Sequence, residues 1–190
     1  MKYDLEKIKA DIKESLSSYR YNHSINVMEE AIKLGKHYHI DINKCAACAL
    51  THDLAKEFSE EENKNLIEKY NLSKDLLNEE NKNLLHGILS SLIVKEKYNF
   101  TDDMCAAIKY HTTGHPGMSL LAKIIYLADK IEKGKNYPGI TLERTLAYQN
   151  LNKAIITCLN NQIKNLTLKQ KPINNLALLT KEFLEKETNK

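Results

Sequence analysis

Four histidines occupy positions at which an imidazole would face the interior of the protein. His23 and His86 each lie on an apolar stripe with helical spacing, and His52 and His111 each end such a stripe. A single histidine in this setting is usually a hydrogen-bonded core residue, so only the set of four indicates a site. We expect four helices each to direct one imidazole inward.

Two acidic residues belong with these histidines. Asp129 continues the apolar stripe of Leu121 and Ile125, where an unpaired charge is costly to bury. Asp53 directly follows His52 at the end of an alanine-rich helix, so the pair can turn two different ligands toward one ion where the helix frays. A buried cluster of four imidazoles and two carboxylates is difficult to satisfy without a metal.

The donor atoms of this predicted cluster are nitrogen and oxygen, which favour hard or borderline metals. A single metal ion rarely takes six ligands from the protein, so these six donors fit two metals bridged by a carboxylate. Structural zinc instead prefers four ligands, commonly thiolates. The alternative is that the histidines separately cap helix ends or hydrogen-bond to carbonyl groups.

Other potential ligands are interpreted as structural. Cys45 and Cys48 have C-x-x-C spacing, but no second pair follows at zinc-finger spacing and the segment is rich in alanine, so both are predicted to be small core residues. His37 and His39 cannot share a helix face, and their position near a helix end suits a contact with the helix dipole.

Two basic residues lie close in sequence to the predicted ligands. Lys56 follows Asp53 by three residues, which can place its ammonium group near a substrate phosphate; the alternative is a solvated lysine. Arg20 precedes His23 by three residues on the same helix, so we expect it to border the same pocket.

A glycine-containing turn is predicted directly after His111. Its backbone N–H groups and hydroxyls, from Thr112, Thr113 and Gly114, are suited to binding an anion, with His115 close behind.

These residues are expected to be positioned by helices alone, because no alternating strand pattern occurs. Apolar periodicity, capping residues and breakers predict helices over about 5–16, 19–34, 43–55, 59–70, 80–97, 101–111 and 121–131, a long helical pattern over 141–168, and a last helix beyond Pro172.

The composition is that of a soluble, helix-rich domain. The 190 residues fit a single domain (1–190), with a core over about 19–144 and C-terminal helices over about 141–188 packing on it. A net charge of +3, evenly interleaved, does not favour nucleic acid as a partner. We find neither a secretory leader nor a membrane span, so we expect a cytoplasmic protein with free thiols. The sequence leaves open whether the C-terminal helices form a homodimer.

Five short motifs occur in order along the chain, and together they resemble the YqeK-type HD-domain proteins, which are symmetrical bis(5'-nucleosyl)-tetraphosphatases. The resemblance extends from about residue 19 to 144. The motifs are Arg20–Ser24, His52–Lys56, Leu85–Gly87, His111–Gly114 and Ile125–Glu132.

The resemblance implies an all-helical HD bundle that cleaves diadenosine tetraphosphate into two ADP. It also implies a dinuclear centre, usually assigned as iron, at which a hydroxide would be the nucleophile. The ligands of one metal would be His23, His52, Asp53 and Asp129, and Asp53 would bridge to a second metal held by His86 and His111.

The chain departs from the family pattern in two places. Members often continue with Ile-Glu-Pro-x-Arg where this chain has Lys133 and Lys135, so Lys135 replaces the arginine only as a point charge. His115 stands where an arginine is frequent, so phosphate binding there would depend on pH. These changes affect the grip on the polyphosphate and not the metal ligands.

Three alternative functions remain open from the sequence. A different HD phosphohydrolase, acting on a nucleoside monophosphate, a dNTP or a cyclic dinucleotide, would need the same metals. A second alternative is oxygenase chemistry at a di-iron centre, although the basic and hydroxyl residues near His111 favour a phosphate-containing substrate. The third is a non-catalytic, nucleotide-sensing module with structural metals.

Overall fold

The computed structural model of the chain describes residues 2–78 and 81–189. Over these residues the chain forms helices and turns without any strand, so the predicted all-α fold is confirmed. The elements are α1 (Leu5–Ser15), α2 (Ser18–His37), α3 (Ile42–Thr51), α4 (Glu60–Lys69), the 3-10 helix η1 (Lys74–Leu77), α5 (Lys82–Tyr98), α6 (Asp102–Lys109), α7 (Leu120–Ile131), α8 (Ile140–Gln149), α9 (Leu151–Leu168) and α10 (Asn175–Thr188). The predicted start of the fifth helix near residue 80 lies outside the described residues.

Local capping interactions set where the helices begin. The side chain of Ser17 accepts a hydrogen bond from the first turn of α2, and that of Asp41 does the same for α3. Ser59 and Glu62 form the reciprocal capping box expected from the sequence at the start of α4. Since these boundaries are fixed locally, the positions of residues on each helix face are fixed with them.

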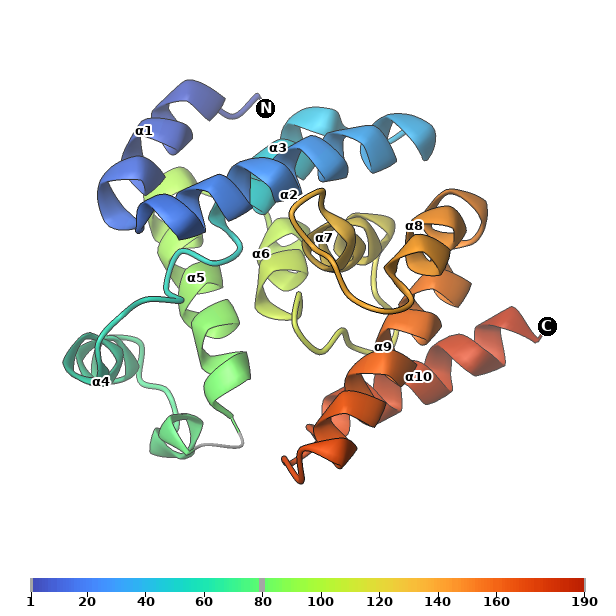
Figure 1. Cartoon of the computed structure of the whole chain (residues 1–190). Coiled ribbons are helices and arrows are strands. Elements are labelled where there is room, and N and C mark those ends of the chain that lie inside the picture. Colours follow the sequence, from blue (N-terminus) through green and yellow to red (C-terminus); the bar gives the residue numbers. More distant parts are fainter. Residues whose placement is uncertain (1, 79–80, 190) are drawn as a thin grey trace.

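Helix α7 lies at the centre of the molecule (Figure 1). Every residue of this helix except Leu120, Lys123 and Lys130 is buried, as expected for a helix that is apolar on nearly all sides. It contacts α2 and α3 on one side, α6 on another, and α8 and α9 on a third. Asp129 is therefore carried by the most enclosed element of the fold.

Gly87 allows α5 and α6 to approach closely. A Cβ atom at this position would lie 2.6 Å from the carbonyl oxygen of Lys109, at the end of α6. Only glycine avoids this clash. The close approach brings His86, which precedes Gly87, next to His111, which follows α6.

The C-terminal region differs from the sequence prediction at one point. The long pattern expected over residues 141–168 is broken at Asn150, whose backbone is extended (φ −159°, ψ 104°). The Asn150 side chain accepts a hydrogen bond from the Lys153 N–H and starts α9, so capping overrides the continuous apolar pattern and α9 folds back on α8. The 3-10 helix η1 was also not predicted, because its four residues are too few to show a period.

No helix in the part of the chain that the structure describes has both the length and the apolar composition needed to cross a membrane.

Candidate active site

Two of the four predicted histidines lie on helices and two lie just beyond helix ends. His23 is in α2 and His86 in α5, whereas His52 follows the end of α3 and His111 follows that of α6. The expectation of four helical histidines was therefore wrong for His52 and His111. All four are buried, as predicted.

His52 and His111 are each oriented by a hydrogen bond from the imidazole to a carbonyl group of the preceding helix. The Nδ1–H of His52 donates to the carbonyl oxygen of Ala49 at 2.7 Å, and that of His111 donates to Ile108 at 2.7 Å. Carbonyl groups in the last turn of a helix lack helical partners, which is why they accept these bonds. With the proton held on Nδ1, each imidazole presents the lone pair of Nε2 to the interior, the arrangement seen in metal-ligating histidines.

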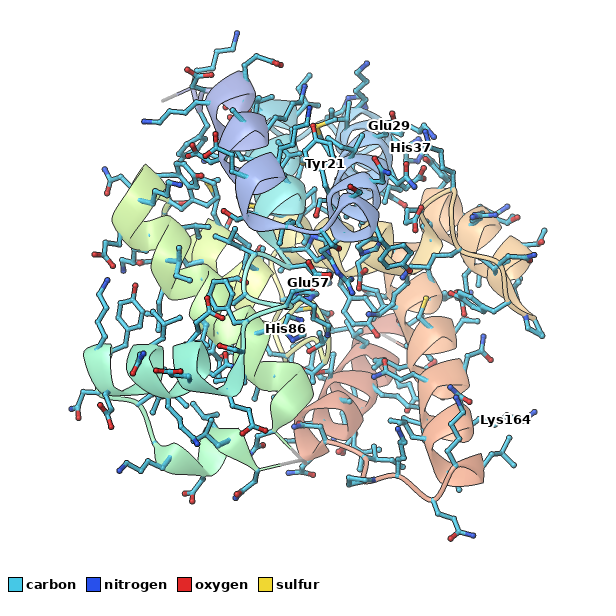
Figure 2. All side chains as sticks on the ribbon, turned by 60° about the vertical axis from the view of Figure 1, so that its left-hand side comes forward. Tyr21, Glu29, His37, Glu57, His86 and Lys164 are labelled. Carbon is cyan, nitrogen blue, oxygen red and sulfur yellow. The ribbon has the colours of Figure 1, made fainter. Side chains whose placement is uncertain are left out.

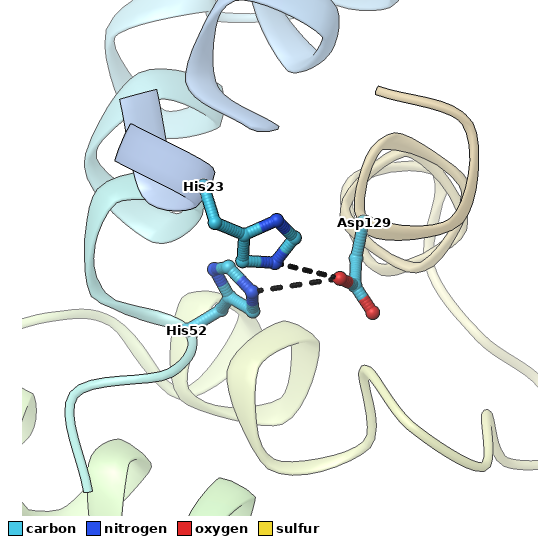
Figure 3. A group of neighbouring side chains, drawn as sticks. All are labelled: His23, His52 and Asp129. Atoms are coloured by element: carbon cyan, nitrogen blue, oxygen red, sulfur yellow. Dashed lines mark hydrogen bonds and ion pairs between the residues drawn. The ribbon is translucent and has the colours of Figure 1, made fainter. Parts of the chain in front are cut away.

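His23 is held between two buried carboxylates. Its Nδ1 lies 3.3 Å from Glu132 Oε1, and its Nε2 lies 3.1 Å from Asp129 Oδ1. Figure 3 shows His23 and His52 both directed at the same oxygen of Asp129, with His52 Nε2 at 3.8 Å. Glu132 is the outer partner of His23, and its other oxygen accepts from the Gly134 N–H.

The two oxygens of Asp53 face different pairs of imidazoles. Oδ2 lies 3.5 Å from His52 Nε2 and 3.8 Å from His23 Nε2. Oδ1 lies 3.2 Å from His86 Nε2 and 3.4 Å from His111 Nε2. This is the arrangement that a bridging carboxylate requires.

Protonation states in the cluster suit metal binding. Burial lowers the pKa of His86 to about 4 and also lowers that of His111, so both imidazoles are neutral at pH 7. Burial alone would raise the pKa of Asp53, but the imidazoles of His52, His111 and His86 hold it well below its usual range. Neutral imidazoles and ionised carboxylates are the forms that coordinate cations.

The geometry of the donor atoms provides an independent test of whether the residues fit a metal. His52 Nε2 is buried and makes no hydrogen bond to any described residue, although two carboxylate oxygens lie 3.5 and 3.8 Å from it. An unsatisfied buried nitrogen is costly, and a metal ion would satisfy it. Two sets of three donors have their ligand atoms within 4.8 Å of one another: His23, His52 and Asp129, and His52, Asp53 and His111. The residues present therefore fit metal ions.

Cationic side chains surround the cluster. Arg20 Nη1 lies 2.6 Å from Asp53 Oδ2, and Lys56 Nζ lies 3.3 Å from His86 Nδ1. Lys130 Nζ lies 2.8 Å from Asp129 Oδ2. Burial lowers the pKa of Lys56. The result is a concentration of positive charge around the carboxylates, as expected for a site that accepts anions.

A cavity of about 390 Å³ opens beside the cluster. Of the residues predicted to bind substrate, five line it: Arg20, Lys56, Thr112, Thr113 and Lys135. Lys135 Nζ lies 4.0 Å from Asp129 Oδ1, close enough to reach an anion held at the centre.

Gly114 and His115 are not brought into the lining of this cavity. Gly114 adopts a positive φ of 65°, and a Cβ there would meet Thr180 at 2.7 Å, so glycine serves the turn and its packing. The Nδ1–H of His115 donates to the Pro116 carbonyl, and its ring packs on Tyr110. This geometry argues against the predicted phosphate contact of both residues.

Several residues near the site were not predicted from the sequence. Glu132 and Lys130 both lie within the motif Ile125–Glu132. The spacing of three residues between Asp129 and Glu132, which is typical of one helix face, could have indicated Glu132. The far wall of the cavity could not be predicted from the sequence, because its residues are ordinary apolar or amide side chains of α9, of α10 and of the segment between these two helices. They are Gln162, Ile163, Leu166, Pro172, Ile173, Asn174 and Ala177.

The residues excluded from the site lie elsewhere. Cys45 and Cys48 are buried in the core, where burial raises the pKa of the Cys45 thiol to about 12, so their prediction as core residues is confirmed. His37 is the last residue of α2 and does not line the cavity. Figure 2 shows His86 in the middle of the molecule and His37 well away from it.

Comparison with known proteins gives consistent results. The model of the HD domain matches residues 20–134. The chain is 41% identical to a protein of Halalkalibacterium halodurans named symmetrical bis(5'-nucleosyl)-tetraphosphatase, over 93% of this chain and 95% of that protein. It is 36% identical to a Bacillus subtilis protein of the same name, over 94% and 96% of the two chains.

A solved structure extends this similarity to the whole fold. A crystal structure from Clostridium acetobutylicum, described as a predicted HD superfamily hydrolase involved in NAD metabolism, superposes with a TM-score of 0.88 at 30% identity. The similarity covers 98% of this chain and all of that one.

Proposed function

We propose a function from the premise that this chain belongs to the HD-domain family and, within it, to the symmetrical bis(5'-nucleosyl)-tetraphosphatases. The chain is a metal-dependent hydrolase that cleaves diadenosine tetraphosphate into two molecules of ADP. The observation that carries this function is the position of Asp53, whose two oxygens face separate imidazole pairs beside a cavity lined by cations.

We propose that the centre holds two metal ions. His23, His52 and Asp129 would hold one, His86 and His111 the other, and Asp53 would bridge them. When bound, two such ions supply activation of water and polarisation of phosphoryl oxygens. Iron is proposed from the family resemblance, and imidazole and carboxylate ligands are compatible with it.

The cationic residues are proposed to hold the polyphosphate. Lys56 and Lys135 line the cavity beside the cluster, where they offset the charge of a tetraphosphate and of the departing ADP. Arg20 makes its contact with Asp53 through Nη1, and its buried Nε has no partner among the described residues. The guanidinium therefore retains a donor for a phosphate oxygen.

The hydroxyl residues of the turn after α6 contribute less directly. Thr113 donates its hydroxyl to the Gly114 carbonyl oxygen, so we propose that it shapes the wall of the cavity. Thr112 also lines the cavity, and we propose that it contacts the substrate.

A panel of nucleotides tests this function. Purified protein is analysed for bound metals and is then incubated with diadenosine tri-, tetra- and pentaphosphate, a nucleoside monophosphate, a dNTP and a cyclic dinucleotide. We expect metal close to two ions per chain and the fastest turnover with the tetraphosphate. Preference for a mononucleotide would favour another HD phosphohydrolase, and metal-loaded protein that turns over none of them would favour a sensing module. Cytoplasmic location remains a prediction from the sequence.

A further inference from the structure

A second cavity, of about 670 Å³, adjoins the first. It lies between the segment connecting α7 to α8 and one face of α9. Lys130, Lys135 and Gln162 line both cavities. These three side chains therefore stand at the boundary between the two cavities, next to the metal centre.

The walls of this second cavity combine polar and apolar groups. The buried carboxylate of Glu143 accepts hydrogen bonds from the Tyr137 hydroxyl and from Asn161 Nδ2, which fixes both side chains. Pro138 and Leu168 supply apolar surface, and Leu168 is 74% exposed although it is a large hydrophobic residue. A mostly apolar pocket with a few fixed polar groups is suited to a flat heterocycle and its sugar.

Gln162 provides an independent indication of a ligand at the junction of the cavities. Its Oε1 is buried, and no group within residues 2–78 and 81–189 hydrogen-bonds to it. A buried acceptor without a partner is unfavourable. Rotation of the side chain toward the cavities would let a ribose hydroxyl or an exocyclic amine of a bound nucleoside supply the missing donor, while the neighbouring Lys130 and Lys135 suit its phosphates.

The first cavity alone is small for a dinucleoside tetraphosphate. Its volume of about 390 Å³ is near the lower end of the roughly 300–1,000 Å³ usual for ligand pockets, and part of this space borders the metal centre. Cleavage at the middle of the tetraphosphate gives two equal halves of the substrate, and the enzyme must accommodate a nucleoside on each half. The apolar wall of Leu166, Ile173 and Ala177 in the first cavity can receive one of them.

We propose that the second cavity binds the other nucleoside of the substrate, with Lys130 and Lys135 holding the phosphates that connect the two halves. This inference rests on the proposed function, because it requires a substrate with two nucleosides. Discrimination in favour of dinucleotides over mononucleotides then comes from the segment connecting α7 to α8 and from α9.

A pair of tryptophan variants on α9 tests the proposal. Asn165 is exposed and lines only the second cavity, so Asn165→Trp obstructs it without touching a metal ligand. Asn160 is exposed on the same helix and lines neither cavity, so Asn160→Trp is the matched control. Metal content and melting temperature are measured for both. Diadenosine tetraphosphate is the two-nucleoside substrate, and adenosine 5'-tetraphosphate serves as the one-nucleoside probe, both as a substrate and as a competitive inhibitor.

We expect Asn165→Trp to lower kcat/KM for diadenosine tetraphosphate by about ten-fold or more, equivalent to about 1.4 kcal/mol of lost binding. The inhibition constant of adenosine tetraphosphate should stay within about two-fold, because its single nucleoside can use the first cavity. Asn160→Trp should change neither. An unchanged kcat/KM in Asn165→Trp, or an equal loss for both nucleotides, would overturn the proposal. Failure of the unmodified protein to hydrolyse either nucleotide would instead count against the proposed function.

Discussion

At the scale of single residues, Asp53 has the most demanding role because each of its oxygens faces a different half of the cluster. We predict that Asp53→Ala and His52→Ala each lose metal and abolish turnover, since His52 contributes a terminal ligand and Asp53 the bridge. Glu30→Gln is the matched control, because Glu30 is a buried carboxylate outside the cavity. Elemental analysis, circular dichroism at low temperature and turnover are compared. Full metal content with near-normal activity in Asp53→Ala would rule out a dinuclear site.

Lys56 is predicted to act on the substrate rather than on the ions. Lys56→Ala should leave metal content unchanged and slow hydrolysis by roughly 100-fold, the usual effect of removing one stabilising donor. Lys69→Ala, which removes an exposed ammonium paired with Glu96, should have no effect on the rate. If Lys56→Ala is kinetically silent at both saturating and subsaturating substrate, Lys56 is a solvated lysine with no catalytic role.

Glu132 is predicted to position His23 for metal binding. Glu132→Ala removes the partner of His23 Nδ1 and should weaken metal affinity by roughly 10–100-fold, as found when outer partners of ligating histidines are lost. Glu132→Gln keeps a carbonyl acceptor at the same place and should retain most of the affinity. The measurement is a metal titration of both variants. Equal affinities in the unmodified protein and Glu132→Ala would show that His23 does not depend on this contact.

At the scale of helices, the approach of α5 to α6 determines whether His86 and His111 meet. In Gly87→Ala, the higher helix propensity of alanine should add up to about 1 kcal/mol to the free energy of unfolding. Overpacking of the new Cβ against the Lys109 backbone should remove roughly 1–3 kcal/mol, because backbone atoms cannot move aside as a side chain can. We predict a lower melting temperature together with reduced metal content.

Gly35→Ala is the control for this prediction. Its Cβ would meet the Cys45 sulfur at 2.9 Å, in the core between α2 and α3. It should lower the melting temperature while leaving metal content normal. Normal metal content in Gly87→Ala would show that the site tolerates separation of the two helices.

The helices were largely predictable from the sequence, whereas their contacts were not. The apolar stripe of α7 and the capping box at Ser59 identify their elements locally. The break at Asn150 was not predicted, because asparagine also occurs in the interior of helices and so does not by itself mark a helix end. The six proposed ligands could be singled out because buried imidazoles and carboxylates are chemically unusual, and the structure brings them together. The apolar wall of the cavity resembles any core surface and gave no such indication.

At the scale of the whole molecule, the metal cluster and the substrate walls come from different parts of the chain. All six predicted ligands lie within residues 20–134, which match the HD domain. The residues from α9 and α10 that line the first cavity, and most of those lining the second, lie beyond this range. We therefore propose that metal binding is a property of the shared domain and that the choice of nucleotide depends on the C-terminal helices.

The central claim, metal-dependent cleavage at the middle of the tetraphosphate, is tested most directly by chromatography of the products of diadenosine tetraphosphate. The reaction is run with metal-loaded protein, with metal-stripped protein and after metal is restored. We predict ADP alone from the loaded protein, no product from the stripped protein, and recovery of ADP formation with added metal. Equal amounts of ATP and AMP would contradict symmetrical cleavage, and undiminished ADP formation by the stripped protein would contradict the metal-dependent mechanism.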